Sequence, residues 1–182
     1  MYRFAAIIAV IALGASAPAG ATTLARLSHE QVVDAADAIV EGTVTRVWSA
    51  PDERGHVWTR AYVRVDSSLK GGEAVGNVVM VEAAGGSAAT GEVTQVGLTA
   101  RYSEGERVLL YLCEKRHNTI YGTVGMLMGK YTIKQNPADG SDMVVRFTLP
   151  PTVAYDARFI PNPPAGERVS LASMEAKVAA RV

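Results

Sequence analysis

The chain has 182 residues with 18 basic and 18 acidic side chains, a length that suits one domain with a sizeable core. Because the charges balance, neither nucleic acid nor an anionic membrane would be attracted electrostatically, and we expect neither as a partner. Cys113 is the only cysteine, which excludes a disulfide within the chain, so the fold must rest on its hydrophobic core.

The N-terminal residues have the parts of an export signal. Arg3 gives a positive start, residues 4–13 (FAAIIAVIAL) are an unbroken apolar run, and residues 19–21 (AGA) match the small-x-small pattern that signal peptidase cuts. The apolar run is shorter than the roughly 20 residues that span a bilayer, which disfavours an uncleaved membrane anchor. We expect residues 1–21 to be a signal peptide. The mature chain would then start at Thr22, have no transmembrane segment, and be periplasmic or extracellular.

One short helix is expected early in the mature chain. Ser28 can cap it and Gln31 can reach back to the Ser28 backbone, which is the pattern of a capping box. Apolar residues at helical spacing follow, and we expect the helix to end near Ala38.

From Ile39 onward, alternation and β-branched or aromatic residues predict strands. Residues 39–49 and 57–66 flank turn residues at 51–55, which predicts a hairpin. Further strands are expected at 75–83, 92–98, 107–113, 121–128, 130–134 and 143–149. The most apolar of them, 107–113 (RVLLYLC), should lie at the centre of the sheet, and Gly129 should mark a bulge or bend.

The C-terminal part of the chain differs from the strand-rich part. Residues 150–164 hold five of the eight prolines and are expected to form an extended arm outside the sheet. Residues 171–181 predict a short helix capped by Ser170. The fold class is therefore mainly β, a small OB-like β-barrel over residues 22–149 with a short N-terminal helix, followed by the arm and helix of 150–182.

Several segments resemble those of a widespread group of uncharacterised exported bacterial proteins. They are 35–44 (AADAIVEGTV), 69–71 (LKG), 105–112 (GERVLLYL) and 129–131 (GKY). The resemblance implies an OB-like β-barrel that is similar in outline to the barrel of tissue inhibitors of metalloproteinases and netrin-like modules. Those inhibitors rely on an N-terminal cysteine and several disulfides, which this chain does not have, so the resemblance implies their fold and not their inhibitory mechanism.

The predicted hairpin concentrates large side chains that suit recognition. With its turn centred on Glu53, Trp48 would face Trp58. In that register Arg46 would face Arg60 and Val44 would face Tyr62. The facing arginines would repel each other, which indicates a register shift by a bulge at Gly42.

Exposed tryptophan, tyrosine and arginine are enriched in protein interfaces, and in an OB barrel this face also stacks oligonucleotides or sugars. The alternative is that one or both tryptophans close the end of the core. We predict an exported, non-enzymatic domain that binds a protein or peptide of the cell envelope or medium. Its predicted partner-binding residues are Trp48, Trp58, Arg60 and Tyr62.

Two other classes of function stay open. One is a thiol-dependent hydrolase that uses Cys113 and His117, although a cysteine ending an apolar strand more commonly packs in the core. The other is an envelope accessory domain that binds glycan. His29, His56 and His117 lack the spacing of metal ligands, and the chain has no phosphate-binding or dinucleotide motif. We therefore expect no metal, no cofactor and no catalytic residues.

Overall fold

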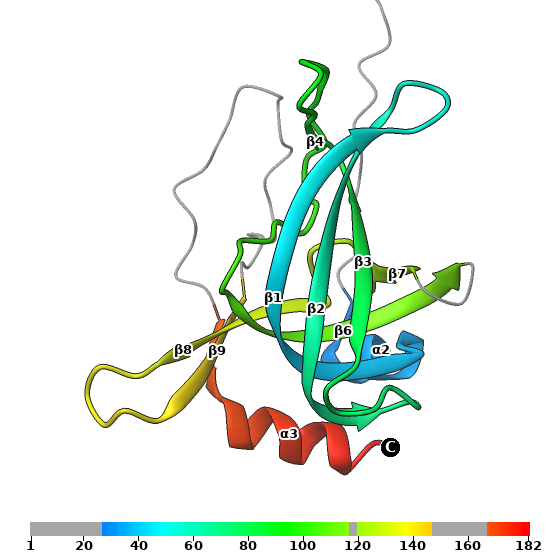
Figure 1. The fold of residues 1–182 in the computed structure, drawn as a ribbon. Helices are drawn as coiled ribbons and strands as arrows, with labels where there is room; N and C mark the ends of the chain where they lie inside the picture. The colour runs from blue at the N-terminus through cyan, green and yellow to red at the C-terminus, as the bar shows by residue number, and fades with distance from the viewer. Residues whose placement is uncertain (1–26, 117–119, 147–166) are drawn as a thin grey trace, which may run out of the picture.

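The computed structural model describes residues 27–116, 120–146 and 167–182 (Figure 1). The predicted signal peptide, the proline-rich arm and His117 lie outside these residues. In chain order the elements are α2 (His29–Ala35), β1 (Ala38–Pro51), β2 (Val57–Lys70), β3 (Val78–Ala84), β4 (Gly86–Ser87), β5 (Val93–Thr94), β6 (Arg107–Arg116), β7 (Ile120–Thr123), β8 (Lys130–Gln135), β9 (Asp142–Arg146), β10 (Glu167–Ser170) and α3 (Leu171–Ala179). The predicted mainly β class is confirmed.

The strands form one large sheet and one small one. Neighbours in the large sheet follow the order β1-β2-β3-β7-β6-β8-β9-β10, and β4 pairs with β5 separately. Because β1 also pairs with β6, the strands β1, β2, β3, β7 and β6 close into a ring. Within this ring β3 and β7 are parallel, whereas the other neighbours run antiparallel.

Strand β6 lies at the centre of the sheet, as its apolar sequence predicts. It pairs with β1 on one edge and with β7 and β8 on the other. Successive side chains of a strand point to opposite faces. Accordingly, Leu110 and Leu112 enter a core cluster inside the ring, and Leu109 and Tyr111 enter a second cluster shared with both helices. Both faces of β6 are buried, which explains its continuous apolar run.

Strands β7 and β8 both pair with β6, and a compact turn connects them. Residues 124–128 form this turn where a longer strand was expected. Gly129 closes the turn, because its N–H donates to the Val124 carbonyl at 2.8 Å and its carbonyl accepts from the Tyr111 N–H at 2.8 Å. A Cβ on Gly129 would lie 2.8 Å from the Tyr111 oxygen, so the backbones approach this closely only with glycine. Gly129 therefore marks a bend, as expected.

Local signals predicted the start of both helices correctly, whereas α2 ends at Ala35 and not near Ala38, which already belongs to β1. The capping box of α2 is complete, with the Ser28 hydroxyl accepting from the Gln31 N–H and the Gln31 side chain accepting from the Ser28 N–H. Ser170 caps α3 in the same way by accepting from the Ser173 N–H. In the described part of the chain, neither helix is long and apolar enough to cross a membrane.

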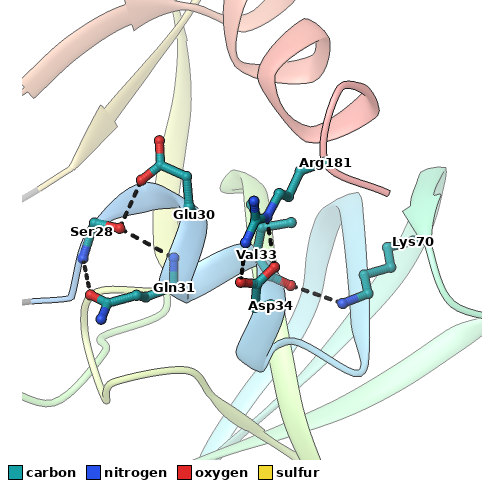
Figure 2. A network of polar contacts seen from close by, with 7 residues as sticks. All are labelled: Ser28, Glu30, Gln31, Val33, Asp34, Lys70 and Arg181. Carbon is teal, nitrogen blue, oxygen red and sulfur yellow. Dashed lines mark hydrogen bonds and ion pairs between the residues drawn. The ribbon is translucent and has the colours of Figure 1, made fainter.

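The two helices and the end of β2 are tied together by charged side chains (Figure 2). Arg181 donates two hydrogen bonds to the Asp34 carboxylate of α2, at 2.8 and 2.6 Å. Lys70 Nζ donates to the Val33 carbonyl at 2.9 Å. The C-terminal end of the chain is therefore held against α2, and α3 covers the second core cluster.

Some predicted elements were too long, and two strands, β4 and β10, were not expected. Only Val93–Thr94 of the expected strand 92–98 is a strand, because its residues are mostly exposed and pair only with β4. Strand β10, Glu167–Ser170, pairs with β9 and was not expected. It lacks the apolar alternation that predicts a strand, and its pairing depends on a distant part of the chain.

Candidate functional site

The first hairpin extends well beyond the strand ring. β1 pairs with β6 only from Ala38 to Thr43, whereas its pairing with β2 continues to Pro51. In Figure 1, β1, β2 and β3 accordingly rise side by side above β6. The outer half of this three-stranded segment is where the sequence placed the candidate residues.

The predicted register of the hairpin is wrong by two residues. Pro51 pairs with Val57, so the turn is centred on Arg54 and not on Glu53. A five-residue loop closes the hairpin, with the Asp52 N–H donating to the His56 carbonyl at 2.8 Å. This one-residue displacement of the centre moves the pairs between Arg46 and Pro51 by two positions, and the irregularity before Arg46 reduces the displacement to one at Val44, which pairs with Val63.

With the corrected register, Trp48 faces Arg60 and not Trp58, and Arg46 faces Tyr62. No two arginines face each other across these strands. The expected bulge at Gly42 is confirmed, since the register shifts between Glu41 and Gly42, and it shifts again between Val44 and Arg46. From Arg46 outward the predicted face is kept, because a shift by two leaves each side chain on its side of the sheet. Val44, expected to face Tyr62 on this surface, instead packs in the core cluster inside the ring.

We call this outer surface the hairpin face. It consists of Arg46, Trp48 and Ala50 of β1, Trp58, Arg60 and Tyr62 of β2, and Met80 and Glu82 of β3. Both tryptophans are half-buried, and neither belongs to either core cluster. The structure therefore brings the four predicted residues, Trp48, Trp58, Arg60 and Tyr62, onto one surface.

A stack of three side chains forms the exposed part of the hairpin face. The rings of Trp48 and Tyr62 lie with centroids 4.8 Å apart and planes tilted by 53°. The Arg46 guanidinium carbon lies 5.4 Å from the Trp48 ring centroid, within cation–π range. Tyr62 is 36% exposed and Arg46 is exposed as well. The stack offers broad aromatic surface beside a positive charge.

Arg60 has a structural role within this surface. Its Nε donates to Glu82 Oε1 at 2.9 Å, and Glu82 is buried to 9% exposure. A buried carboxylate needs such a charged partner to offset its desolvation. Arg60 is therefore a positioning residue for β3 next to the aromatic stack. Glu82 could not be identified from the sequence, because its place opposite Arg60 depends on how β2 and β3 pair.

Trp58 is held at the tip of the hairpin by Asp52. The Asp52 carboxylate accepts hydrogen bonds from the N–H groups of Arg54 and His56, both at 2.9 Å, and from Trp58 Nε1 at 3.2 Å. Burial alone would raise the pKa of Asp52, but the donors, led by the His56 N–H, lower it below its ordinary value. The ionised carboxylate thus organises the loop and fixes the indole.

This anchoring predicts a pH effect at low pH. A carboxyl whose pKa is lowered by folding stabilises the folded loop above its ordinary pKa of 3.8, and that stabilisation is lost as the pH falls through the lowered value. We expect the Trp58 Nε1–H resonance in NMR spectra to shift as Asp52 is protonated. Asp52→Ala should show the shifted resonance at all pH values.

Asp139→Ala removes a turn carboxylate of similar bonding between β8 and β9. It should leave the Trp58 resonance as in the native protein. An unshifted resonance in Asp52→Ala would contradict the anchoring.

The thiol and histidine candidates are dispersed in the described part of the chain. Cys113 is half-buried and packs against the second core cluster beside Gly122 of β7. His29 Nε2 lies 3.0 Å from the hydroxyl of the buried Tyr111, and His56 is exposed in the hairpin loop. Within residues 27–116, 120–146 and 167–182, no three histidine, cysteine, aspartate or glutamate side chains are grouped as a metal site would require.

Comparison with known proteins adds no assignment to this geometry. No protein-family model matches the chain, and no curated protein matches it.

Proposed function

We propose that this chain is an exported, non-enzymatic domain that binds a protein or peptide through the hairpin face. The observation that carries the proposal is the Arg46–Trp48–Tyr62 stack, in which Arg46 and Tyr62 are exposed and which lies on strands that extend beyond the ring. Aromatic and arginine side chains contribute most of the binding energy in protein interfaces. Export rests on the signal-peptide pattern of residues 1–21, which places the site in the periplasm or the medium.

The arrangement of the ring supports an OB-type barrel as the scaffold. An OB fold is a five-stranded Greek-key barrel that binds ligands on the face of its second and third strands and on the loop between the first and second. Here the ring has five strands, and the hairpin face lies on β1, β2 and β3 next to the β1–β2 loop. The proposed site therefore occupies the position that this scaffold uses for ligands. The proposed kinship with uncharacterised exported bacterial proteins rests on the sequence segments 35–44, 69–71, 105–112 and 129–131.

The side chains of the hairpin face define what a partner must present. The Trp48 and Tyr62 rings offer an apolar surface to an apolar or aromatic side chain. Arg46 offers a guanidinium to a carboxylate beside it, while Arg60 and Arg64 are engaged by Glu82 and Asp66. A peptide segment with an acidic residue next to a large apolar one would satisfy both groups.

Removal of the two indoles tests the proposal. We expect the immobilised mature protein to capture a partner from envelope or culture-medium proteins, and Trp48→Ala/Trp58→Ala to lose it. For hot-spot side chains the loss should be about 30-fold or more in Kd, measured by titration with the purified partner. Circular dichroism checks that the fold is intact.

Val75→Ala is the matched control, because Val75 is an exposed apolar side chain between β2 and β3, outside the hairpin face. It should bind like the native protein. If the double variant binds the same partner with unchanged Kd, or if the native protein captures nothing, the hairpin face is not a protein-binding site. If cell-wall glycan retains the native protein but not the double variant, the face binds sugars instead.

A further inference from the structure

A buried carboxyl group lies under the C-terminal helix, away from the hairpin face. Glu41 of β1 is 8% exposed, and its Oε1 atom is shielded from solvent with no hydrogen-bond partner among the described residues. Its neighbours in the sheet are Ser67 of β2 and Leu109 of β6, neither of which offers a positive charge. A buried carboxylate in this position is costly, and a proton removes most of the cost.

The groups facing Glu41 add more negative than positive charge. Glu175 of α3 lies within hydrogen-bonding reach of it, and Asp142 of β9 is close enough to repel it. Arg107 of β6 attracts it, but both terminal guanidinium nitrogens of Arg107 already donate to Asp142, at 2.9 and 2.8 Å. Asp66 of β2 also acts on Arg107. Burial first, and Glu175 second, therefore raise the pKa of Glu41 to about 7.

Glu175 is placed in the middle of a helix that is otherwise fixed by its own contacts. Leu171, Met174 and Val178 of α3 enter the second core cluster, and Arg181 binds Asp34 beyond the helix end. A protonated Glu41 carboxyl can donate a hydrogen bond to Glu175, whereas an ionised Glu41 is repelled by the negative charges that face it. The charge state of Glu41 thus acts directly on the docking of α3.

We propose that Glu41 and Glu175 form a proton-dependent latch between β1 and α3, closed by a shared proton and weakened when that proton is lost. With α3 undocked, Glu41 is exposed to water and has its ordinary pKa of 4.5. The docked state therefore binds the proton more tightly. Its extra stability is complete below pH 4.5 and is lost as the pH rises to about 7. An exported domain would meet such changes in its surroundings directly.

Hydrogen exchange of the α3 amides tests the latch in the full-length protein. After correction for intrinsic exchange rates, the opening constant of α3 should rise on the order of 50-fold between about pH 5 and pH 8. Glu41→Gln stays neutral at every pH and can donate to Glu175, so its opening constant should be nearly independent of pH. Glu53→Gln, in the exposed hairpin loop, should keep the native profile.

Two further measurements keep the test decisive if Glu41→Gln folds poorly. In Glu175→Gln the amide donates to the Glu41 carboxylate, so the rise in opening should shrink and move to lower pH. Carbon-13 NMR should show the Glu41 carboxyl titrating near neutrality. A native profile in Glu41→Gln, a flat profile in the native protein, or titration of Glu41 near 4.5 would each overturn the latch.

Discussion

Gly42→Ala should lower the free energy of unfolding by about 3 kcal/mol, at the upper end of what overpacking a rigid site costs. A Cβ at this position would lie 2.4 Å from the Arg64 carbonyl oxygen and 2.6 Å from Val63 Cγ1. Both atoms belong to β2, directly across the bulge that turns β1 into the ring. The oxygen is part of the backbone, so the added methyl group can be accommodated only by separating the two strands.

Gly72→Ala is the matched control for this substitution. Gly72 is exposed after β2, and a Cβ there would meet no atom within 4 Å. We expect the free energy of unfolding to change by no more than about 0.5 kcal/mol in either direction, since alanine restricts the unfolded chain. Urea unfolding followed by circular dichroism compares the two variants. Equal midpoints for both would show that β1 and β2 are not in close contact at Gly42.

Signals contained in a short stretch of sequence were sufficient for much of the fold. The capping residues Ser28 and Ser170 predicted both helix starts, because a cap depends only on the next three residues. The apolar run of β6 predicted its central place, because only a strand buried on both faces needs no polar positions. These features are decided locally, before any distant part of the chain is brought close.

Features that depend on distant pairing could not be predicted. The hairpin register rests on how Asp52 closes a five-residue loop, and a shift of the loop centre by one residue exchanged the partners of Trp48. The face was predicted correctly for Arg46 and Trp48, because alternation along a strand does not depend on register, whereas the irregularity before Arg46 places Val44 in the core. Glu82 lies far along the chain from Arg60, and Glu175 lies far along the chain from Glu41. The residues next to Arg60 and Glu41 in the sequence therefore do not identify these partners.

One signal in the sequence did mark the buried acid. Glu41 interrupts the apolar stretch of β1, which is buried from Ala38 to Gly42. A charged residue within such a stretch is costly unless a partner is supplied, so its presence indicates a partner elsewhere in the fold. The sequence could thus indicate that Glu41 was unusual, while the identity of Glu175 required the structure.

Two tyrosines that alternate with other residues along predicted strands should have different effects when removed, one on stability and the other on partner binding. Tyr111→Ala should cost about 4 kcal/mol of stability, because the ring is fully buried and its loss leaves a cavity. The Tyr131 and His29 rings pack against it with centroids 5.8 and 5.9 Å away, so the site cannot collapse without moving β8 and α2. A loss of this size is a large part of the stability of a typical domain.

Tyr62→Ala should instead cost less than about 1 kcal/mol, because Tyr62 is 36% exposed on the hairpin face, where its ring packs against Trp48. Its effect should fall on partner binding, by weakening the stack that the proposed ligand would cover. Thermal unfolding and partner titration of both variants separate the two roles. Tyr111→Phe keeps the ring and loses the contact between its hydroxyl and His29, so it should cost about 1 kcal/mol and bind normally. If Tyr62→Ala lowered stability as much as Tyr111→Ala, the hairpin face would be part of the core and not a surface available to a partner.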